Sequence, residues 1–249
     1  MMRNRLMTIV MAIILIFSWN NTMYAQEKPT ALLEYDHDVT GDGVRNKITL
    51  YGIPFESNSK FYQKVWAEIE LRDGKKVRID YEGGYEPKLE FADLNHDGVD
   101  DILYSSATGG SGGLYNYALH TLKDAQLKEI PLPEPLQIEG AFQNDFKAII
   151  EIPGIKDPIV LDLSSRKDDY ISLGLFQKNG MLNEPTELMI DPIAFFEIVK
   201  VKNKKGYGLK GYRQISGAYH ADGLGTVETT WYYENGKWNP VKVEWKTSE

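Results

Sequence analysis

The residues best suited to chemistry in this sequence lie in a short acidic loop, residues 93–101. The loop reads Asp-Leu-Asn-His-Asp-Gly-Val-Asp-Asp. Oxygen-bearing side chains therefore stand at its positions 1, 3, 5 and 9, which are Asp93, Asn95, Asp97 and Asp101. The glycine at position 6 permits a sharp turn, and the carbonyl of Val99 at position 7 can add a further oxygen. Calcium takes oxygen ligands at this spacing, so the sequence predicts a Ca²⁺ site.

A less complete copy of the pattern occupies residues 38–46. Its candidate ligands are Asp38, Thr40, Asp42, the carbonyl of Val44, and Asn46. This loop has fewer carboxylates than residues 93–101, and affinity in such loops rises with ligand charge, so we expect the tighter site at 93–101. Asx-turns use the same residue types without an ion. That metal-free alternative stays open for both loops, and more so for residues 38–46.

Neither loop has the features of an EF-hand. Thr49 and Tyr104 stand at position 12, where that motif needs a bidentate glutamate. The residues before and after each loop also favour strands over helices. Each loop is therefore predicted to join two β-strands.

The segment from Phe91 to Leu103 resembles an FG-GAP or VCBS-type repeat, a calcium loop of integrin-like β-propellers and many exported bacterial proteins. Residues 38–50 match it more loosely, with Asn46 where the family usually has Asp and Lys47 inserted before the apolar residues. The resemblance implies a structural ion in a surface-exposed or adhesive protein. No third acidic loop follows at the same spacing, so we expect two such units.

The N-terminus has the features of an export signal. Arg3 and Arg5 precede an apolar stretch at residues 6–17, which is shorter than the roughly 20 residues that span a membrane. We predict a signal peptide over residues 1–25 and a secreted, extracellular mature protein with no membrane contact after cleavage. An uncleaved anchor is the alternative. The sequence contains no cysteine, so it has neither a disulfide nor a lipid-attachment cysteine.

The acidic balance of the chain bears on its partners. The formal net charge is −8 at pH 7 and becomes more negative once the two arginines of the signal are removed. Nucleic-acid affinity depends on Lys and Arg that neutralise phosphates, so the charge argues against a nucleic-acid partner. An acidic surface does attract divalent cations.

Strand signals dominate the sequence, and two hairpins stand out. Apolar and polar side chains alternate through residues 65–71 and 77–81, on either side of an Asp73-Gly74 turn. A second hairpin closes the chain around Asn235-Gly236. Residues 192–201 suit a short apolar helix or a strand equally.

These signals predict a mostly β fold of antiparallel hairpins and strand–loop–strand units, and a partial propeller-like arrangement is one form that the units could take. Prolines at residues 131–136 favour an extended connector. We therefore predict a β unit with both calcium loops at residues 26–130 and a β-rich C-terminal part at 137–249. The two parts can also pack as one domain.

Catalytic patterns are weaker than the metal pattern. Ser111 lies in a Gly-x-Ser-x-Gly segment, but residues 114–117 favour a strand where a serine hydrolase needs a helix. The histidines form no metal-spaced pair, and His96 is expected to point into solvent. The segment 217–223, with His220, could supply an acid or base or could be a polar turn.

The last hairpin concentrates aromatic side chains: Trp231, Tyr232, Tyr233, Trp238 and Trp245. They either pack a core or stack on sugar rings or a partner protein. We expect an exported calcium-binding β protein, not an enzyme, that binds a cell surface, a polysaccharide of the wall or a protein partner. The alternative is a secreted hydrolase of serine or glycoside type, whose catalytic residues the sequence does not identify.

Overall fold

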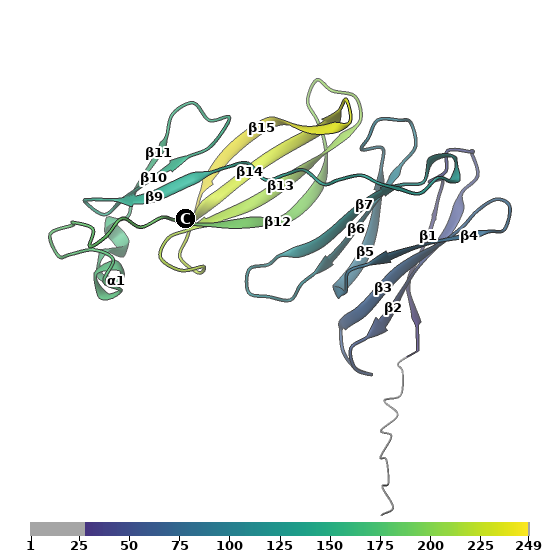
Figure 1. Ribbon diagram of the computed structural model, residues 1–249, viewed down its shortest axis with the longest axis horizontal. Coiled ribbons are helices and arrows are strands. Elements are labelled where there is room, and N and C mark those ends of the chain that lie inside the picture. Colours follow the sequence, from purple (N-terminus) through teal and green to yellow (C-terminus); the bar gives the residue numbers. More distant parts are fainter. Residues whose placement is uncertain (1–27, 249) are drawn as a thin grey trace, which may run out of the picture.

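The computed structural model describes residues 28–248, and the predicted signal peptide lies outside this part of the chain. The described residues form three antiparallel sheets, and the prediction of a mostly β fold is confirmed (Figure 1). Among residues 28–248, helical structure is limited to α1 (Lys167–Ser172) and two 3₁₀ turns, Lys123–Ala125 and Ser164–Arg166. No helix in the described part is long and apolar enough to cross a membrane.

The first sheet contains eight strands and carries both acidic loops. They are β1 (Thr30–His37), β2 (Asn46–Pro54), β3 (Phe61–Glu70), β4 (Lys76–Tyr81), β5 (Gly84–Ala92), β6 (Asp101–Ala107), β7 (Tyr115–Thr121) and β8 (Lys128–Glu129). Their order is β1-β2-β3-β5-β6-β7-β8, with β4 also paired to β3. The predicted hairpin around Asp73-Gly74 is therefore confirmed as β3–β4. Its Trp66 is buried against Tyr51 and Arg78, although the alternation placed it on a polar face.

The two strand–loop–strand units belong to this one sheet, with β3 between them. Residues 38–46 join β1 to β2, and residues 93–101 join β5 to β6. The two units are thus not separate blades of a propeller, and no sheet closes into a barrel. Three antiparallel pairings separate β1 from β5 along the sheet, yet the two loops lie against each other, with Gly41 close to Val99.

The C-terminal part contains the other two sheets. A small one pairs β11 (Ile159–Asp162), β10 (Lys147–Glu151) and β9 (Glu139–Gln143). A larger one runs β12 (Met189–Lys200), β13 (Tyr207–Ser216), β14 (Gly223–Glu234) and β15 (Lys237–Thr247). The ambiguous segment 192–201 is thus a strand, and the predicted hairpin around Asn235-Gly236 is confirmed as β14–β15.

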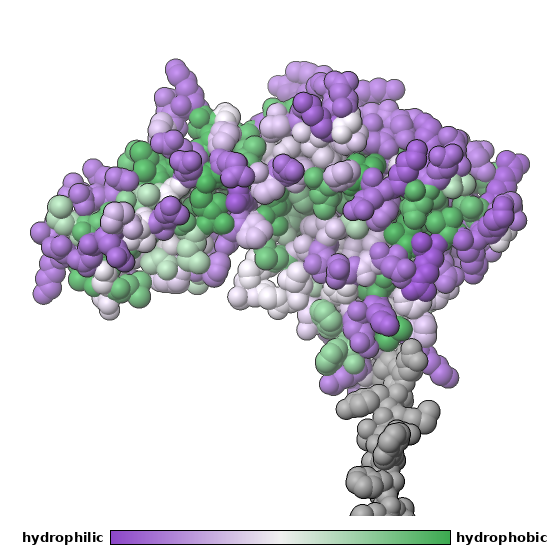
Figure 2. Space-filling model, viewed as in Figure 1, coloured by the Kyte–Doolittle hydropathy of each residue, from purple (hydrophilic) through white to green (hydrophobic). Residues whose placement is uncertain are grey.

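Two apolar clusters form the interiors of the two parts, and a third joins them. The first sheet packs around Ile48, Leu50 and Ile102, and the C-terminal part packs around Phe142 and Ile215. The joining cluster brings residues of the first sheet together with residues of β12, β13, β14 and β15: Leu94, Leu103, Leu119, Ile130, Leu209, Phe196, Tyr233 and Trp238. Figure 2 shows the side chains of the two halves meeting in a continuous surface.

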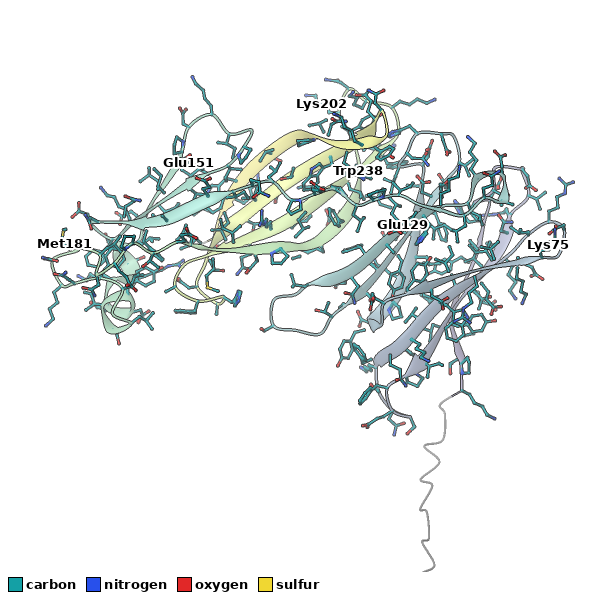
Figure 3. The ribbon with its side chains drawn as sticks, viewed as in Figure 1. Lys75, Glu129, Glu151, Met181, Lys202 and Trp238 are labelled. Atoms are coloured by element: carbon teal, nitrogen blue, oxygen red, sulfur yellow. The ribbon has the colours of Figure 1, made fainter. Side chains whose placement is uncertain are left out.

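The connector at residues 131–136 has no regular secondary structure and is held by side chains of the larger C-terminal sheet. Trp238 Nε1 donates to the carbonyl of Pro131 at 2.7 Å, and Arg213 Nη1 donates to the carbonyl of Leu136 at 2.6 Å. In Figure 3, Trp238 lies near the junction of the two halves. These contacts fix the chain where it leaves one sheet for the next.

The aromatic residues of the last hairpin pack against this chain itself. Trp231 and Tyr232 are buried, and Tyr233 and Trp238 belong to the cluster that joins the sheets. Trp245 packs against the core of the C-terminal part. Of the two readings of the hairpin, core packing therefore accounts for these rings.

Candidate metal centre

The two acidic loops, residues 38–46 and 93–101, have the same strand register. His37, just before the first loop, pairs with Asn46 at its position 9. Ala92, just before the second loop, pairs with Asp101 at the same position. The alignment therefore contains no insertion: Lys47 replaces the apolar Ile102, and our expectation of an inserted residue is wrong.

Corresponding backbone groups also make the same hydrogen bonds. The position-6 amides of Gly43 and Gly98 donate to the position-1 carboxylates at 2.9 and 3.1 Å. The position-7 amides of Val44 and Val99 donate to the position-5 carboxylates at 2.9 and 3.0 Å. These carboxylates are Asp38 and Asp42 in the first loop, and Asp93 and Asp97 in the second. Position 4 is left-handed in both loops, with φ of 76° at Gly41 and 62° at His96. The two loops are structural copies of one another.

The two position-1 carboxylates differ in whether their Oδ1 atom accepts hydrogen bonds. Asp38 Oδ1 accepts from the Gly41 amide at 2.8 Å and from the amide and hydroxyl of Thr40 at 3.2 and 3.3 Å. Partial burial opposes ionisation, but the amides of Gly41, Gly43 and Thr40 outweigh it and lower the pKa of Asp38. Asp93 Oδ1, in contrast, is buried and has no hydrogen-bond partner among the described residues.

The side chains at position 9 also differ between the two loops. Asn46 is 2% exposed, and both ends of its amide are engaged, with the Val39 amide and the Glu70 carbonyl each 3.1 Å away. Asp101 is fully buried and accepts from the amides of Leu94 and Asn95, each at 2.9 Å. Burial raises the pKa of Asp101 to about 6, despite those hydrogen bonds. The second loop therefore holds a carboxylate where the first holds a neutral amide.

Lys123 contributes positive charge beside the second loop. Its Nζ donates to the Asp97 carbonyl at 2.5 Å and lies 3.6 Å from Asp97 Oδ1. A pocket of about 370 Å³ opens here and is lined by residues that include Asn95, Asp97, Lys123 and Tyr233. Solvent ions can therefore reach the loop, and the sequence pattern gave no hint of Lys123 because it lies beyond β7.

The residues of the second loop fit a divalent cation better than those of the first. A buried carboxylate oxygen without a donor is costly unless a cation or proton compensates it. Between residues 28 and 248, no three Asp, Glu or His side chains are already close enough together to hold a metal ion. Binding would therefore require Asn95 and Asp97, which are partly exposed, to rearrange around Asp93. The first loop offers no such unpartnered oxygen, since its hydrogen bonds make it a complete Asx-type turn.

The two loops are in direct contact. His37 Nε2 lies 2.6 Å from Asp100 Oδ2, and its ring stacks on Phe91 with centroids 4.7 Å apart. Gly41 lies so close to Val99 that an added Cβ would be 2.4 Å from the valine Cγ2. The first loop therefore buttresses the second.

His96 does not point into solvent, and that expectation is wrong. Its Nδ1 lies 3.0 Å from the Tyr233 carbonyl, and its Nε2 lies 2.9 Å from the Tyr207 carbonyl. The imidazole also stacks on Tyr232, with centroids 4.1 Å apart. Position 4 of the loop is thus bound to the C-terminal sheet, a contact that no local sequence pattern reveals.

The hydrolase pattern gains no support from the contacts of its residues. Ser111 lies in an exposed loop between β6 and β7, and no hydrogen bond within residues 28–248 links it to His220. His220 instead lies 3.0 Å from Asp191 Oδ1. The neighbouring Asp222 is buried and accepts hydrogen bonds from Arg166 and Tyr170. Residues 217–223 therefore form a turn that is held in place by hydrogen bonds.

Comparison with known proteins places the chain in a family. Residues 136–246 match the family described as the YybI C-terminal domain. The matched segment begins at the last residue of the connector and covers both C-terminal sheets except the last residue of β15. The uncharacterized protein YybI of Bacillus subtilis (strain 168) is 30% identical over 214 residues, which cover 81% of this chain and 77% of that protein. No solved structure matches the chain significantly. The chain therefore belongs to the YybI family.

Proposed function

We propose that this chain is an exported calcium-binding β protein in which one Ca²⁺ stabilises residues 93–101. The loop is of FG-GAP or VCBS type, and its Asp93, Asn95, Asp97 and Asp101 side chains and the Val99 carbonyl would hold the ion. The ion would supply positive charge to the buried oxygens of Asp93 and Asp101. We assign it a structural role, with no catalysis.

The single observation that carries this proposal is the buried Oδ1 of Asp93, which has no hydrogen-bond donor in the described structure. The first loop has the same hydrogen bonds from its position-6 and position-7 amides. In addition, its Asp38 Oδ1 accepts three hydrogen bonds that Asp93 Oδ1 lacks within residues 28–248. A loop that needed no ion would be expected to satisfy this oxygen as Asp38 does. The proposal therefore assigns calcium to residues 93–101 and leaves residues 38–46 as a hydrogen-bonded turn.

Export and partner binding form the second half of the proposal. The basic and apolar N-terminus supports secretion after cleavage near Ala25. Extracellular calcium modules work with dissociation constants of about 10⁻⁴ to 10⁻³ M, which suits a loop with three carboxylates in that setting. The proposed partner is a cell surface, a wall polysaccharide or another protein, bound by a rigid β scaffold.

The experiment that tests the calcium site is calorimetric titration of metal-stripped mature protein, residues 26–249. We expect one binding event and a higher melting temperature in calcium. Asp97→Ala should abolish both effects, because it removes a carboxylate ligand. Asp80→Ala is the matched control, since Asp80 is an exposed carboxylate on β4 whose one partner in the described part of the chain is Arg78. If wild-type protein gives no heat and no shift in melting, the site is an ordinary turn.

A further inference from the structure

The second acidic loop uses alternate side chains for two different purposes. Positions 1, 3 and 5 carry the candidate ligands, and positions 2 and 4 carry Leu94 and His96. Leu94 is fully buried in the cluster that joins the two halves, and this cluster also contains Leu209 of β13. His96 reaches that sheet through polar contacts and stacking.

The imidazole of His96 is in close contact with neighbouring groups on several sides. Its ring nitrogens face two main-chain carbonyls, of Tyr207 on β13 and Tyr233 on β14, and its face lies on Tyr232. Gly206 lies beneath the ring, where an added Cβ would be 3.0 Å from His96 Cδ2. His96 itself has a φ of 62°, a left-handed conformation that is uncommon outside glycine, although Asn, Asp and His adopt it more often than other residues. The fold therefore holds this histidine in one place at a conformational cost.

The first acidic loop makes no equivalent connection. Its position-2 residue, Val39, packs in the core of the first sheet, and its position-4 residue, Gly41, lies against Val99. The contact with the C-terminal sheet thus belongs to the loop that we assign to calcium.

We propose that calcium at residues 93–101 controls how firmly the first sheet is held against the C-terminal sheet, and this inference rests on the proposed calcium site. Ligands at positions 1, 3 and 5 fix the backbone on both sides of positions 2 and 4. An ordered loop keeps Leu94 and His96 in place, and a loose loop releases them. By linkage, a firm contact must in turn tighten calcium binding by the same factor.

The test measures the relation of the two halves directly. The chain has no cysteine, so Lys75→Cys and Lys202→Cys allow two spin labels to be attached, one on the β3–β4 turn and one on the β12–β13 turn. Figure 3 shows these residues on different halves of the molecule. We expect a narrow distribution of label-to-label distances in calcium and a broader one in chelator. An unchanged distribution, in protein that calorimetry shows to bind calcium, would overturn this inference and leave the proposed site intact.

A second measurement uses the reciprocal effect. His96→Asn keeps a side chain that tolerates the left-handed backbone but is too short to stack on Tyr232. We expect calcium affinity to fall by about fivefold or more, within the range of typical coupling, although His96 is not a ligand. His220→Asn, a histidine paired with Asp191 away from this contact, should leave the affinity unchanged. Equal affinity for His96→Asn and wild type would contradict the coupling, and absence of calcium binding in wild type would contradict the proposed site itself.

Discussion

At the scale of single residues, the proposed calcium site depends on one oxygen atom, Oδ1 of Asp93. Asp93 and Asp38 occupy the same place in two copies of one loop, and they differ in whether Oδ1 is hydrogen-bonded. This difference explains why two similar sequence patterns lead to different proposals. The charge count of the sequence favoured the same loop, but only on the number of carboxylates and not on their hydrogen bonds.

Replacement of Asp93 by Asn should affect stability differently with and without calcium. Without calcium, Asp93→Asn removes the charge of a carboxylate whose buried Oδ1 has no donor among the described residues, so stability should be unchanged or higher by about 1 kcal/mol. In saturating calcium the variant should melt below wild type, because a charged ligand is lost. Denaturant unfolding with calcium and with chelator measures both. A variant that loses stability equally in the two conditions would show that Asp93 acts only through its hydrogen bond to Gly98.

His120 gives a prediction for pH dependence. Burial lowers the pKa of His120, whose Nδ1 has no partner among the described residues. The folded protein therefore prefers the neutral imidazole, and this stability is lost as the pH falls below the unfolded value of about 6.5. His120→Gln should flatten the decline in unfolding free energy below that pH, where each unit of pKa shift is worth about 1.4 kcal/mol. His220→Gln is the control, and the idea fails if both variants follow the wild-type curve.

At the scale of elements, the first sheet contains two copies of a strand–loop–strand unit, and the loops of the two copies are in contact. Alanine substitutions at Gly41 and Gly43 distinguish two costs of adding a side chain to the first loop: backbone strain and overlap with a neighbour. Both have a left-handed φ, 76° and 80°, but only Gly41 lies against a neighbour, Val99.

Gly43→Ala should therefore cost only the backbone term, about 1–2 kcal/mol. Gly41→Ala should cost about 1–3 kcal/mol more, because its methyl group overlaps the valine. Chemical denaturation of the two variants gives the comparison. Equal losses would mean that the loops do not pack as tightly as described.

The sequence predicted those elements whose signals are local. The β3–β4 and β14–β15 hairpins were predictable because alternating side chains flank turns of favourable residues. The strand nature of residues 192–201 was not, since the apolar residues of β12 fit either period and pairing with β13 decides between them. Helix α1 was missed because its six residues carry no clear helical periodicity, and only Tyr170 is buried. Burial of Trp66 likewise depends on Tyr51, from a neighbouring strand.

The candidate ligands of each loop come from a similarly local pattern, because they lie within nine consecutive residues, and calcium binding by them stays a prediction. The surroundings of the loop were not predictable. His96 contacts residues more than a hundred positions away, and Lys123 approaches Asp97 from beyond β7. One weak signal was present: position 2 is apolar in both loops, as Val39 and Leu94, and both side chains are fully buried.

At the scale of the whole molecule, the two parts are joined by apolar packing, by His96 and by the connector. The hydrogen bond from Trp238 to the Pro131 carbonyl is the contact that ties the last hairpin to the connector. Aromatic side chains that the sequence left available for a ligand thus help to join the two halves.

Trp238→Phe should lower the free energy of unfolding by about 0.5–1.5 kcal/mol, the usual contribution of one hydrogen bond. Because the ring packs within the chain, retention on immobilised wall polysaccharide should equal that of wild type. Thermal unfolding and a pull-down measure the two quantities. Loss of retention without loss of stability would return Trp238 to a role in ligand binding.

The central claim, that calcium binds at residues 93–101 and not at 38–46, is tested most directly by one nuclear magnetic resonance titration. The amides of Gly98 and Gly43 donate to the position-1 carboxylates of the two loops, so each reports on its own site in the same spectrum. As calcium is added to metal-stripped protein, the Gly98 resonance should move and saturate, and the Gly43 resonance should move much less. A Gly98 resonance that stays in place, or a larger saturating movement at Gly43, would contradict the account.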